Sequence, residues 1–187
     1  MDKRIFIAIS LPDEMKNILA GFISQAKKIN PHQAIHYVKP AGLHLTLHFL
    51  GNRNEREIKL IEEIIKTTCR QHSPMSLITS KINAFPDLKN PTTIILEVKE
   101  KFGSELTKLQ ATLGKKLTTS GISLDDRPWK PHLTVARIKT KTIFKTQNLR
   151  TPNLEFKINH IELMHSQLHP QGSQYKIIKS FTLNPSQ

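Results

Sequence analysis

The sequence predicts an α+β fold in which short strands alternate with three helices. Two observations support this prediction. Apolar residues recur at three- and four-residue steps in three separate stretches, and short β-branched or alternating runs lie between them. The chain of 187 residues is 37% apolar and shows no interdomain linker, so residues 1–187 are predicted to form a single domain with a buried core.

The chain opens with a strand and a helix. Residues 4–11 (RIFIAISL) form an apolar run that is too short for a helix and ends before Pro12. Residues 13–29 are predicted to form a helix with one continuous buried face. The apolar residues of this face are Met15, Ile18, Leu19, Phe22, Ile23, Ala26 and Ile29.

Two further helices follow. The second runs from about residue 55 to 70, and Asn54 with Glu57 forms a capping-box pattern at its start. The third spans roughly residues 102–120, where Gly121 is placed to end it as a left-handed cap. The buried stripe of the third helix is predicted to consist of Phe102, Leu106, Leu109, Leu113 and Leu117.

The remaining short runs have the composition of strands. They cover residues 43–50, 75–84, 92–99, 132–138, 154–166 and 175–183. The polar and basic stretch 140–153 is predicted to be a surface loop between two strands. No glycine-rich turn of the dinucleotide or P-loop type occurs, which argues against nucleotide-triphosphate folds.

Charge and cysteine content indicate the partners and the compartment. The 28 Lys and Arg residues against 15 Asp and Glu give a net charge of +13, which predicts attraction to nucleic acid, with a merely solvated surface as the alternative. The single cysteine, Cys69, excludes an internal disulfide and is expected to be a buried thiol. No membrane span or signal peptide is evident. We therefore expect a cytoplasmic monomer that needs neither a membrane nor an obligate protein partner.

The string His-Leu-Thr occurs twice, at residues 44–46 and at residues 132–134, and each copy follows a helix, a loop and a proline. Side chains alternate along a strand, so each histidine would share one face with its threonine while the neighbouring leucines pack inward. The chain is thus predicted to have two similar lobes. Approximate twofold symmetry between them would bring the two polar faces together across one cleft.

Two such faces suit phosphodiester cleavage without a metal. His44 and His132 could act as acid and base, because an unperturbed imidazole titrates near about pH 6.5. The hydroxyls of Thr46 and Thr134 could donate hydrogen bonds to phosphate oxygens. A single His-x-Thr is more often an unremarkable surface histidine, but a second copy in a matching context reverses that interpretation. A zinc site would lack its third and fourth ligands, so we expect neither a metal nor a cofactor.

The doubled motif and its flanks resemble the 2H phosphoesterase superfamily, and most closely the bacterial and archaeal RNA 2′,3′-cyclic phosphodiesterases once described as 2′-5′ RNA ligases. The resemblance covers nearly the whole chain. It lies in RIFIAISLP, VKPAGLHLTLHFLG, FPDLKNP, DDRPWKPHLTVARI and HIELMHSQLHPQGSQYKIIKSFTL. It implies a bilobal, pseudo-twofold fold in which two antiparallel sheets surround a central cleft, with the helices packed outside.

The resemblance also implies a reaction, namely hydrolysis of 2′,3′-cyclic phosphates on RNA ends or cyclic nucleotides to 2′-phosphomonoesters. By the same analogy His44 would protonate the departing 3′ oxygen and His132 would activate water, although the sequence is nearly symmetric about the two. Thr46 and Thr134 would hold the phosphate oxygens. The alternatives are a ligase or phosphodiesterase acting on 2′-5′ linked RNA, and a basic RNA-binding module without activity.

Further residues are candidates for substrate contacts. Arg137 matches a family arginine that contacts the phosphate, but strict alternation places it on the face opposite His132 unless a bulge re-aims it. Phe49, at the matching offset after His44, could stack on a base or pack in the core. Alternation along the strand places His48 on the same face as His44, where it could be a third titrating group or simply line the rim. The other possible contacts are Arg127, Lys130 and Tyr37.

Overall fold

The structure, a computed structural model, describes residues 2–167 and 173–184, so residues 168–172 of the C-terminal stretch that resembles the family lie outside it. Its α+β class is as predicted. The elements are β1 (Lys3–Ser10), α1 (Asp13–Ile29), β2 (Ile35–Tyr37), the 3₁₀ helix η1 (Pro40–Gly42), β3 (His44–Arg53), α2 (Glu55–Cys69), β4 (Met75–Phe85), β5 (Thr93–Glu100), α3 (Glu105–Thr119), β6 (His132–Ile138), β7 (Glu155–Ile158), β8 (His160–Gln167) and β9 (Gln174–Thr182).

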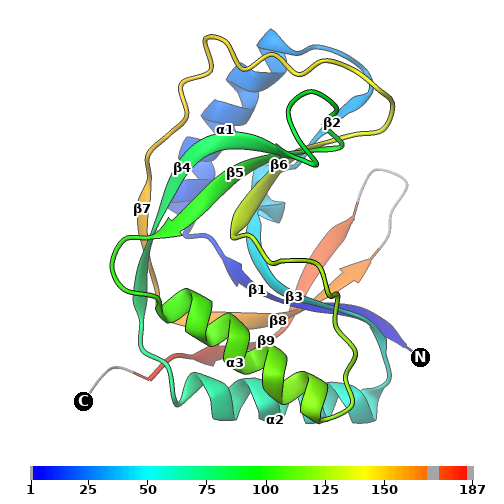
Figure 1. The fold of residues 1–187 in the computed structure, drawn as a ribbon, viewed down its shortest axis with the longest axis vertical. Coiled ribbons are helices and arrows are strands. Elements are labelled where there is room, and N and C mark those ends of the chain that lie inside the picture. Colours follow the sequence, from blue (N-terminus) through cyan, green and yellow to red (C-terminus); the bar gives the residue numbers. More distant parts are fainter. Residues whose placement is uncertain (1, 168–172, 185–187) are drawn as a thin grey trace.

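The strands form two antiparallel groups that join into one curled sheet (Figure 1). The strand order is β7-β4-β5-β6-β3-β1-β8-β9, and β2 pairs with β6. We call β7, β4, β5, β6 and β2 the β6 half, and β3, β1, β8 and β9 the β3 half. The halves join where Leu45 of β3 pairs with Leu133 of β6. The two sheets implied by the resemblance are therefore the two halves of one continuous pairing order.

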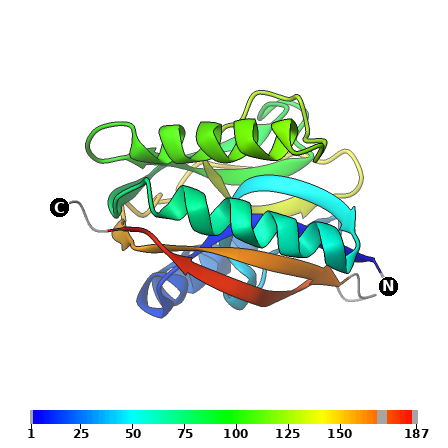
Figure 2. The same ribbon diagram turned by 90° about the horizontal axis from the view of Figure 1, so that it is seen from below.

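The strands β3 and β6 carry the two His-Leu-Thr motifs. Helix α1 precedes β3 but lies against the β6 half, and helix α3 precedes β6 but lies against the β3 half. Helix α1 connects β1 to the β2–β3 segment. Tyr37 of β2 nevertheless donates hydrogen bonds to the carbonyls of Ala26 in α1 and of Asn30 directly after it, so α1 covers the β6 half. Helix α3 connects β5 to β6, yet His48 of β3 bonds to the carbonyl of Gln110 in α3. Figure 2, in which the molecule is seen from below, shows α2 beside α3, and the two helices are in contact. None of the helices within residues 2–167 and 173–184 is long and apolar enough to cross a membrane.

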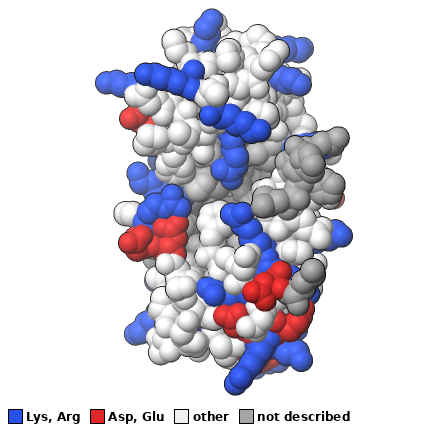
Figure 3. Space-filling view, turned by 90° about the vertical axis from the view of Figure 1, so that its right-hand side faces the viewer, with Lys and Arg blue, Asp and Glu red and all other residues white. Residues whose placement is uncertain are grey.

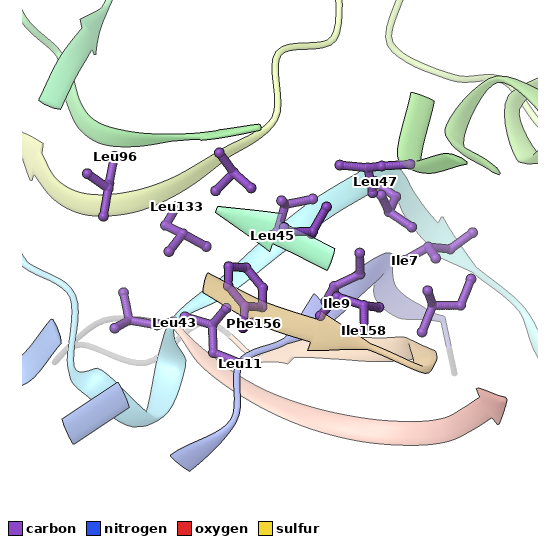
Figure 4. Packing of buried hydrophobic residues seen from close by; sticks show 14 of the residues in the cluster. Ile7, Ile9, Leu11, Leu43, Leu45, Leu47, Leu96, Leu133, Phe156 and Ile158 are labelled. Atoms are coloured by element: carbon purple, nitrogen blue, oxygen red, sulfur yellow. The ribbon is translucent and has the colours of Figure 1, made fainter. Parts of the chain in front are cut away.

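The main hydrophobic core extends across both halves of the sheet and the three helices. Leu45 and Leu133 are fully buried within it, and Figure 4 shows them close together between the two motif strands. Their neighbours Leu43, Leu47 and Val135 are also in this core. The inward packing of the motif leucines is therefore confirmed, and it leaves the histidines and threonines on the opposite face.

The helix ends agree with the sequence. Asn54 and Glu57 form the capping box at the start of α2, each side chain bonding to the other's backbone N–H. Gly121 takes φ +81° after α3, and the N–H groups of Gly121 and Ile122 donate to the carbonyls of Thr118 and Leu117. This is the Schellman pattern that an L side chain at position 121 would strain.

Three expectations about elements are wrong. Ile18 is 45% exposed, because it borders the buried stripe of α1 instead of belonging to it. Phe102 is 75% exposed and precedes α3, since Gly103 at φ +72° makes a turn that the helix cannot include. The strand predicted at 154–166 is two strands separated at Asn159, and β7 pairs with β4 whereas β8 pairs with β1. Residues 140–153 form no helix or strand, as predicted.

Candidate active site

The two His-x-Thr strands meet at the middle residue of each motif. Leu45 and Leu133 are directly paired, and β3 and β6 run antiparallel. In that register residue 44 stands across from residue 134, and residue 46 stands across from residue 132. All four of these histidine and threonine side chains are half-buried on the face turned away from the core. The structure thus brings both copies of the motif into one site.

The two imidazoles are held in the same way. Nδ1 of His44 lies 2.8 Å from the carbonyl oxygen of Gly42, and Nδ1 of His132 lies 2.7 Å from that of Lys130. A carbonyl can only accept, so Nδ1 carries the proton and donates in both rings. The neutral tautomer therefore presents an unprotonated Nε2 in each case, which can take up a proton and later release it.

Both histidines favour the neutral form in the free protein. Burial is the main cause that lowers the pKa of His44 and of His132, and the Arg137 guanidinium lowers both further. His132 also lowers the pKa of His44, because two nearby imidazoles resist carrying charge together. One cation thus acts electrostatically on both rings, which places Arg137 at the same site.

A β-bulge directs Arg137 toward this site. In the pairing of β5 with β6, Ile94 is opposite Ala136 and Ile95 is opposite Thr134, so Val135 is skipped. Val135 and Ala136 are both buried, and the next side chain, Arg137, is exposed on the face that holds His132. The bulge that is needed to bring Arg137 to the face of His132 is therefore present.

A matching bulge occurs in the first copy and corrects the expectation for His48. Ile7 is opposite His48 and Ala8 is opposite Thr46, so Leu47 is skipped. His48 consequently lies on the core side, with Nε2 2.8 Å from the carbonyl oxygen of Gln110, and does not share the face of His44. Burial lowers the pKa of His48.

After this bulge Phe49 returns to the face of His44. It is 53% exposed, and its ring lies 6.2 Å from that of Phe6. Phe49 therefore does not pack in the core, and its exposed ring is available to a base. Each copy of the motif thus delivers a side chain to the site face five residues after its histidine: Phe49 in the first copy and Arg137 in the second.

Aromatic side chains that the motif does not reveal enclose the two histidines. The rings of Phe6 and Tyr175 lie 5.0 and 4.8 Å from that of His44, and the ring of Phe85 meets that of His132 edge-on at 5.0 Å. Trp129 donates from Nε1 to the backbone carbonyl of Thr46 at 2.9 Å, which ties the segment before β6 to β3. The only sequence signal for these residues was their place in the segments that resemble the family.

Three other candidates have different surroundings. The Tyr37 hydroxyl donates to carbonyls of Ala26 and Asn30 on the helix side, and burial raises the pKa of Tyr37 to about 12. Arg127 is exposed and hydrogen-bonded to Asp125. Tyr37 and Arg127 therefore make these hydrogen bonds to groups other than the two histidines. Lys130 is an exposed residue whose carbonyl holds His132.

Positively charged side chains predominate in the upper half of one side of the molecule. Figure 3 shows the side of the molecule that lies at the right in Figure 1, where Lys and Arg side chains are spread over the upper half. Asp and Glu side chains gather mainly in the lower half of this view.

In the described part of the chain, no group of three or more His, Cys, Asp or Glu residues could hold a metal ion. Cys69 is buried and its thiol pKa is raised to about 12, so it is no activated nucleophile.

Known proteins are similar to this chain in sequence and in fold. A family model described as the 2′-5′ RNA ligase superfamily matches residues 17–170. An RNA 2′,3′-cyclic phosphodiesterase of Archaeoglobus fulgidus is 29% identical over 182 residues, which cover 95% of this chain and 99% of that protein. The protein of the same name from Bacillus subtilis is 31% identical over 133 residues, which cover 71% of this chain and 69% of its own.

Solved structures give the same result for the fold. A crystal structure of a Thermus thermophilus protein has a TM-score of 0.79 at 26% identity and covers 98% of this chain and 100% of its own. E. coli LigT complexed with 3′-AMP has a TM-score of 0.77 at 22% identity and covers 98% of this chain and 99% of its own. From the sequence match and the shared fold together, the chain belongs to the 2′-5′ RNA ligase superfamily, the relationship that its doubled His-Leu-Thr motif indicated.

Proposed function

We propose that this protein is an RNA 2′,3′-cyclic phosphodiesterase that opens the cyclic phosphate to a 2′-phosphomonoester. The observation that carries the proposal is the convergence of two identically held imidazoles, His44 and His132, on one face beside Arg137. The names of the Archaeoglobus fulgidus and Bacillus subtilis relatives support the same activity. The proposal assigns the reaction to one chain, residues 1–187, acting as a cytoplasmic monomer without a metal or a cofactor.

In the proposed mechanism the phosphate lies between the two motifs. The Arg137 guanidinium and the hydroxyls of Thr46 and Thr134 donate hydrogen bonds to its non-bridging oxygens. Neutral His132 takes a proton through Nε2 from the attacking water, and the new bond joins that water oxygen to phosphorus. Protonated His44 gives its Nε2 proton to the 3′ oxygen as the bond from phosphorus to that oxygen breaks. The phosphate then remains on the 2′ oxygen.

The bound anion would provide the charge state that this mechanism needs. In the free protein, burial and the Arg137 cation lower the pKa of His44. They therefore disfavour the protonated form that His44 needs in order to act as the acid. A phosphate anion between Arg137 and the two rings offsets that cation and favours the imidazolium. Substrate binding would therefore protonate the group that has to act as the acid.

A product analysis in EDTA tests this proposal. Purified protein is incubated with a 2′,3′-cyclic nucleotide, and the product is assigned as a 2′- or a 3′-phosphate by phosphorus NMR. We expect the 2′-phosphate, turnover slowed by about 10²-fold or more in His44→Ala and in His132→Ala, and full turnover by the control His32→Ala, which alters an exposed histidine in the loop after α1. A substrate that stays intact in the wild-type reaction, or turnover that EDTA abolishes, would refute the proposal.

A further inference from the structure

A cavity of about 250 Å³ opens beside His132, between the ends of β4 and β5 and the segment that leads into β6. Two residues of its wall neighbour His132. Glu97 in the cavity wall is paired with His132 across β5 and β6. Phe85, also in the wall, meets the His132 ring edge-on. The other lining residues that matter here are Asn83 and Lys130.

Glu97 places a partly exposed carboxylate in this cavity. Oε1 accepts a hydrogen bond from Nδ2 of Asn83 at 2.7 Å and lies 3.9 Å from Nζ of Lys81. Oδ1 of Asn83 accepts from the backbone N–H of Ala84 at 2.9 Å, so the amide is fixed in the orientation that donates to Glu97. Oε2 of Glu97 takes part in neither of these contacts, and the side chain is 23% exposed. It can therefore accept hydrogen bonds from a ligand.

The chemistry of the cavity differs from that of the phosphate site next to it. A carboxylate repels a phosphate, so the cavity does not suit a second phosphate group. Its lining offers instead a flat aromatic ring from Phe85, an acceptor from Glu97 and a cation from Lys130. Its volume lies below the range of about 300–1,000 Å³ that is typical of pockets for drug-sized ligands. These properties fit a single nucleobase.

Among the bases, guanine matches this set of groups best. Its N1–H and N2 amino group are adjacent donors that can both bond to one carboxylate, and its O6 accepts from a cation. Uracil offers a single N–H between two carbonyl oxygens, which the carboxylate repels. Cytosine and adenine offer an amino group beside a ring nitrogen that only accepts. Two adjacent donors therefore rank guanine first, and the two carbonyl oxygens beside its N–H rank uracil last.

We propose that the cavity lined by Phe85 and Glu97 binds the nucleobase of the RNA end and that Glu97 selects guanine by accepting hydrogen bonds from N1–H and the N2 amino group. The inference rests on the proposed function, because a phosphate held at the histidines positions the attached nucleoside. Glu97 would be a specificity-determining residue without a part in proton transfer.

The test compares Glu97→Gln with the wild-type chain on 2′,3′-cyclic GMP and 2′,3′-cyclic UMP. We expect wild-type kcat/KM to favour the guanine substrate by about 10-fold, mainly through KM, as one carboxylate-to-base contact pair allows. In Glu97→Gln this ratio should fall to about 2-fold or less, while turnover of the uracil substrate is retained. The control Glu155→Gln makes the same charge change at an exposed residue of β7 and should keep the wild-type ratio.

The ratio separates base selection from the other roles that Glu97 could have. Neutralising Glu97 strengthens the binding of any phosphate, and it does so equally for both substrates. If Glu97 had a merely structural role, its replacement would weaken the binding of both substrates in parallel. Neither effect changes the ratio of kcat/KM for the guanine and uracil substrates. An unchanged ratio in Glu97→Gln, or no guanine preference in the wild type, would overturn the inference.

Calorimetric binding of 2′-GMP and 2′-UMP to both proteins gives the same comparison without turnover. If neither cyclic nucleotide is hydrolysed, the proposed function fails. Glu97-dependent preference for 2′-GMP would then still support the base site, and equal binding of the two nucleotides would refute it.

Discussion

Leu47 and Val135 occupy the same position in two matching bulges, each three residues after the histidine of its motif. Leu47 is skipped in the register of β3 with β1, and Val135 is skipped in that of β6 with β5. Because a skipped residue reverses the alternation of side chains, Phe49 and Arg137 both reach the face of the histidines. The repeat therefore extends beyond the His-Leu-Thr string to the backbone irregularity that follows it.

Arg137 and Arg127 provide a matched pair of substitutions at two exposed arginines. Arg137→Gln should lower kcat/KM for a cyclic nucleotide by about 10²–10³-fold, because the transition state loses a charged donor at its phosphate. Arg127→Gln should stay within about 2-fold of the wild type, since Arg127 bonds to Asp125 instead. Steady-state kinetics on both variants checks this, and equal losses in the two would contradict the placement of Arg137.

The pH dependence of kcat/KM follows from the lowered pKa values of the two histidines. One ring must be protonated and the other neutral, so the profile should be bell-shaped. Burial and Arg137 lower the pKa of both rings, so the optimum should lie below the ordinary histidine value of about 6.5. In Arg137→Gln both pKa values should rise and the optimum should move to higher pH. A flat profile, or a shift of that variant toward lower pH, would be the contrary result.

His48 is expected to contribute to stability and not to proton transfer. Its ring bonds to the carbonyl of Gln110 between β3 and α3, so His48→Ala should lower the free energy of unfolding by about 1–3 kcal/mol. Turnover per folded molecule and the shape of the pH profile should remain those of the wild type. Urea unfolding and a pH series on the same variant measure both properties. Loss of one limb of the profile would show that His48 titrates in the reaction after all.

Leu45 joins the two halves of the sheet, and its truncation should damage both stability and activity. Leu45→Ala should lower the free energy of unfolding by about 2–5 kcal/mol, because the side chain is fully buried. Since Leu45 also fixes the register between the motif strands, the variant should lose turnover under conditions where it remains folded. Leu60→Ala, at a leucine that is 43% exposed on α2, is the control and should change neither property appreciably. A folded and fully active Leu45→Ala would contradict this role.

The sequence was sufficient where a local pattern has a direct physical cause. The helical stripes, the capping box at Asn54 and the left-handed cap at Gly121 depend on residues close together in the chain. The caps appear in the structure as predicted, and so do the stripes, apart from Ile18 and Phe102. The face shared by His44 and Thr46 likewise follows from the alternation of a strand.

The bulges and the aromatic enclosure could not be predicted in the same way. The positions of the two bulges depend on how β3 and β6 pair with β1 and β5, which are not adjacent to the motifs in the sequence. Strict alternation along β3 therefore placed His48 on the wrong face. Phe85 and Tyr175 reach the histidines through long-range strand pairing, and the break at Asn159 reflects a choice between two partner strands. Such features are determined by tertiary contacts.

The central claim is that His44 and His132 act together on one phosphate. Single-turnover rates of His44→Ala, His132→Ala and the double variant on a 2′,3′-cyclic nucleotide test it most directly. We predict that each single variant loses about 10²–10⁴-fold and that the double variant loses little more than the slower single one, because the two groups serve one transition state. Losses that multiply in the double variant, or a single variant with the wild-type rate, would contradict the account.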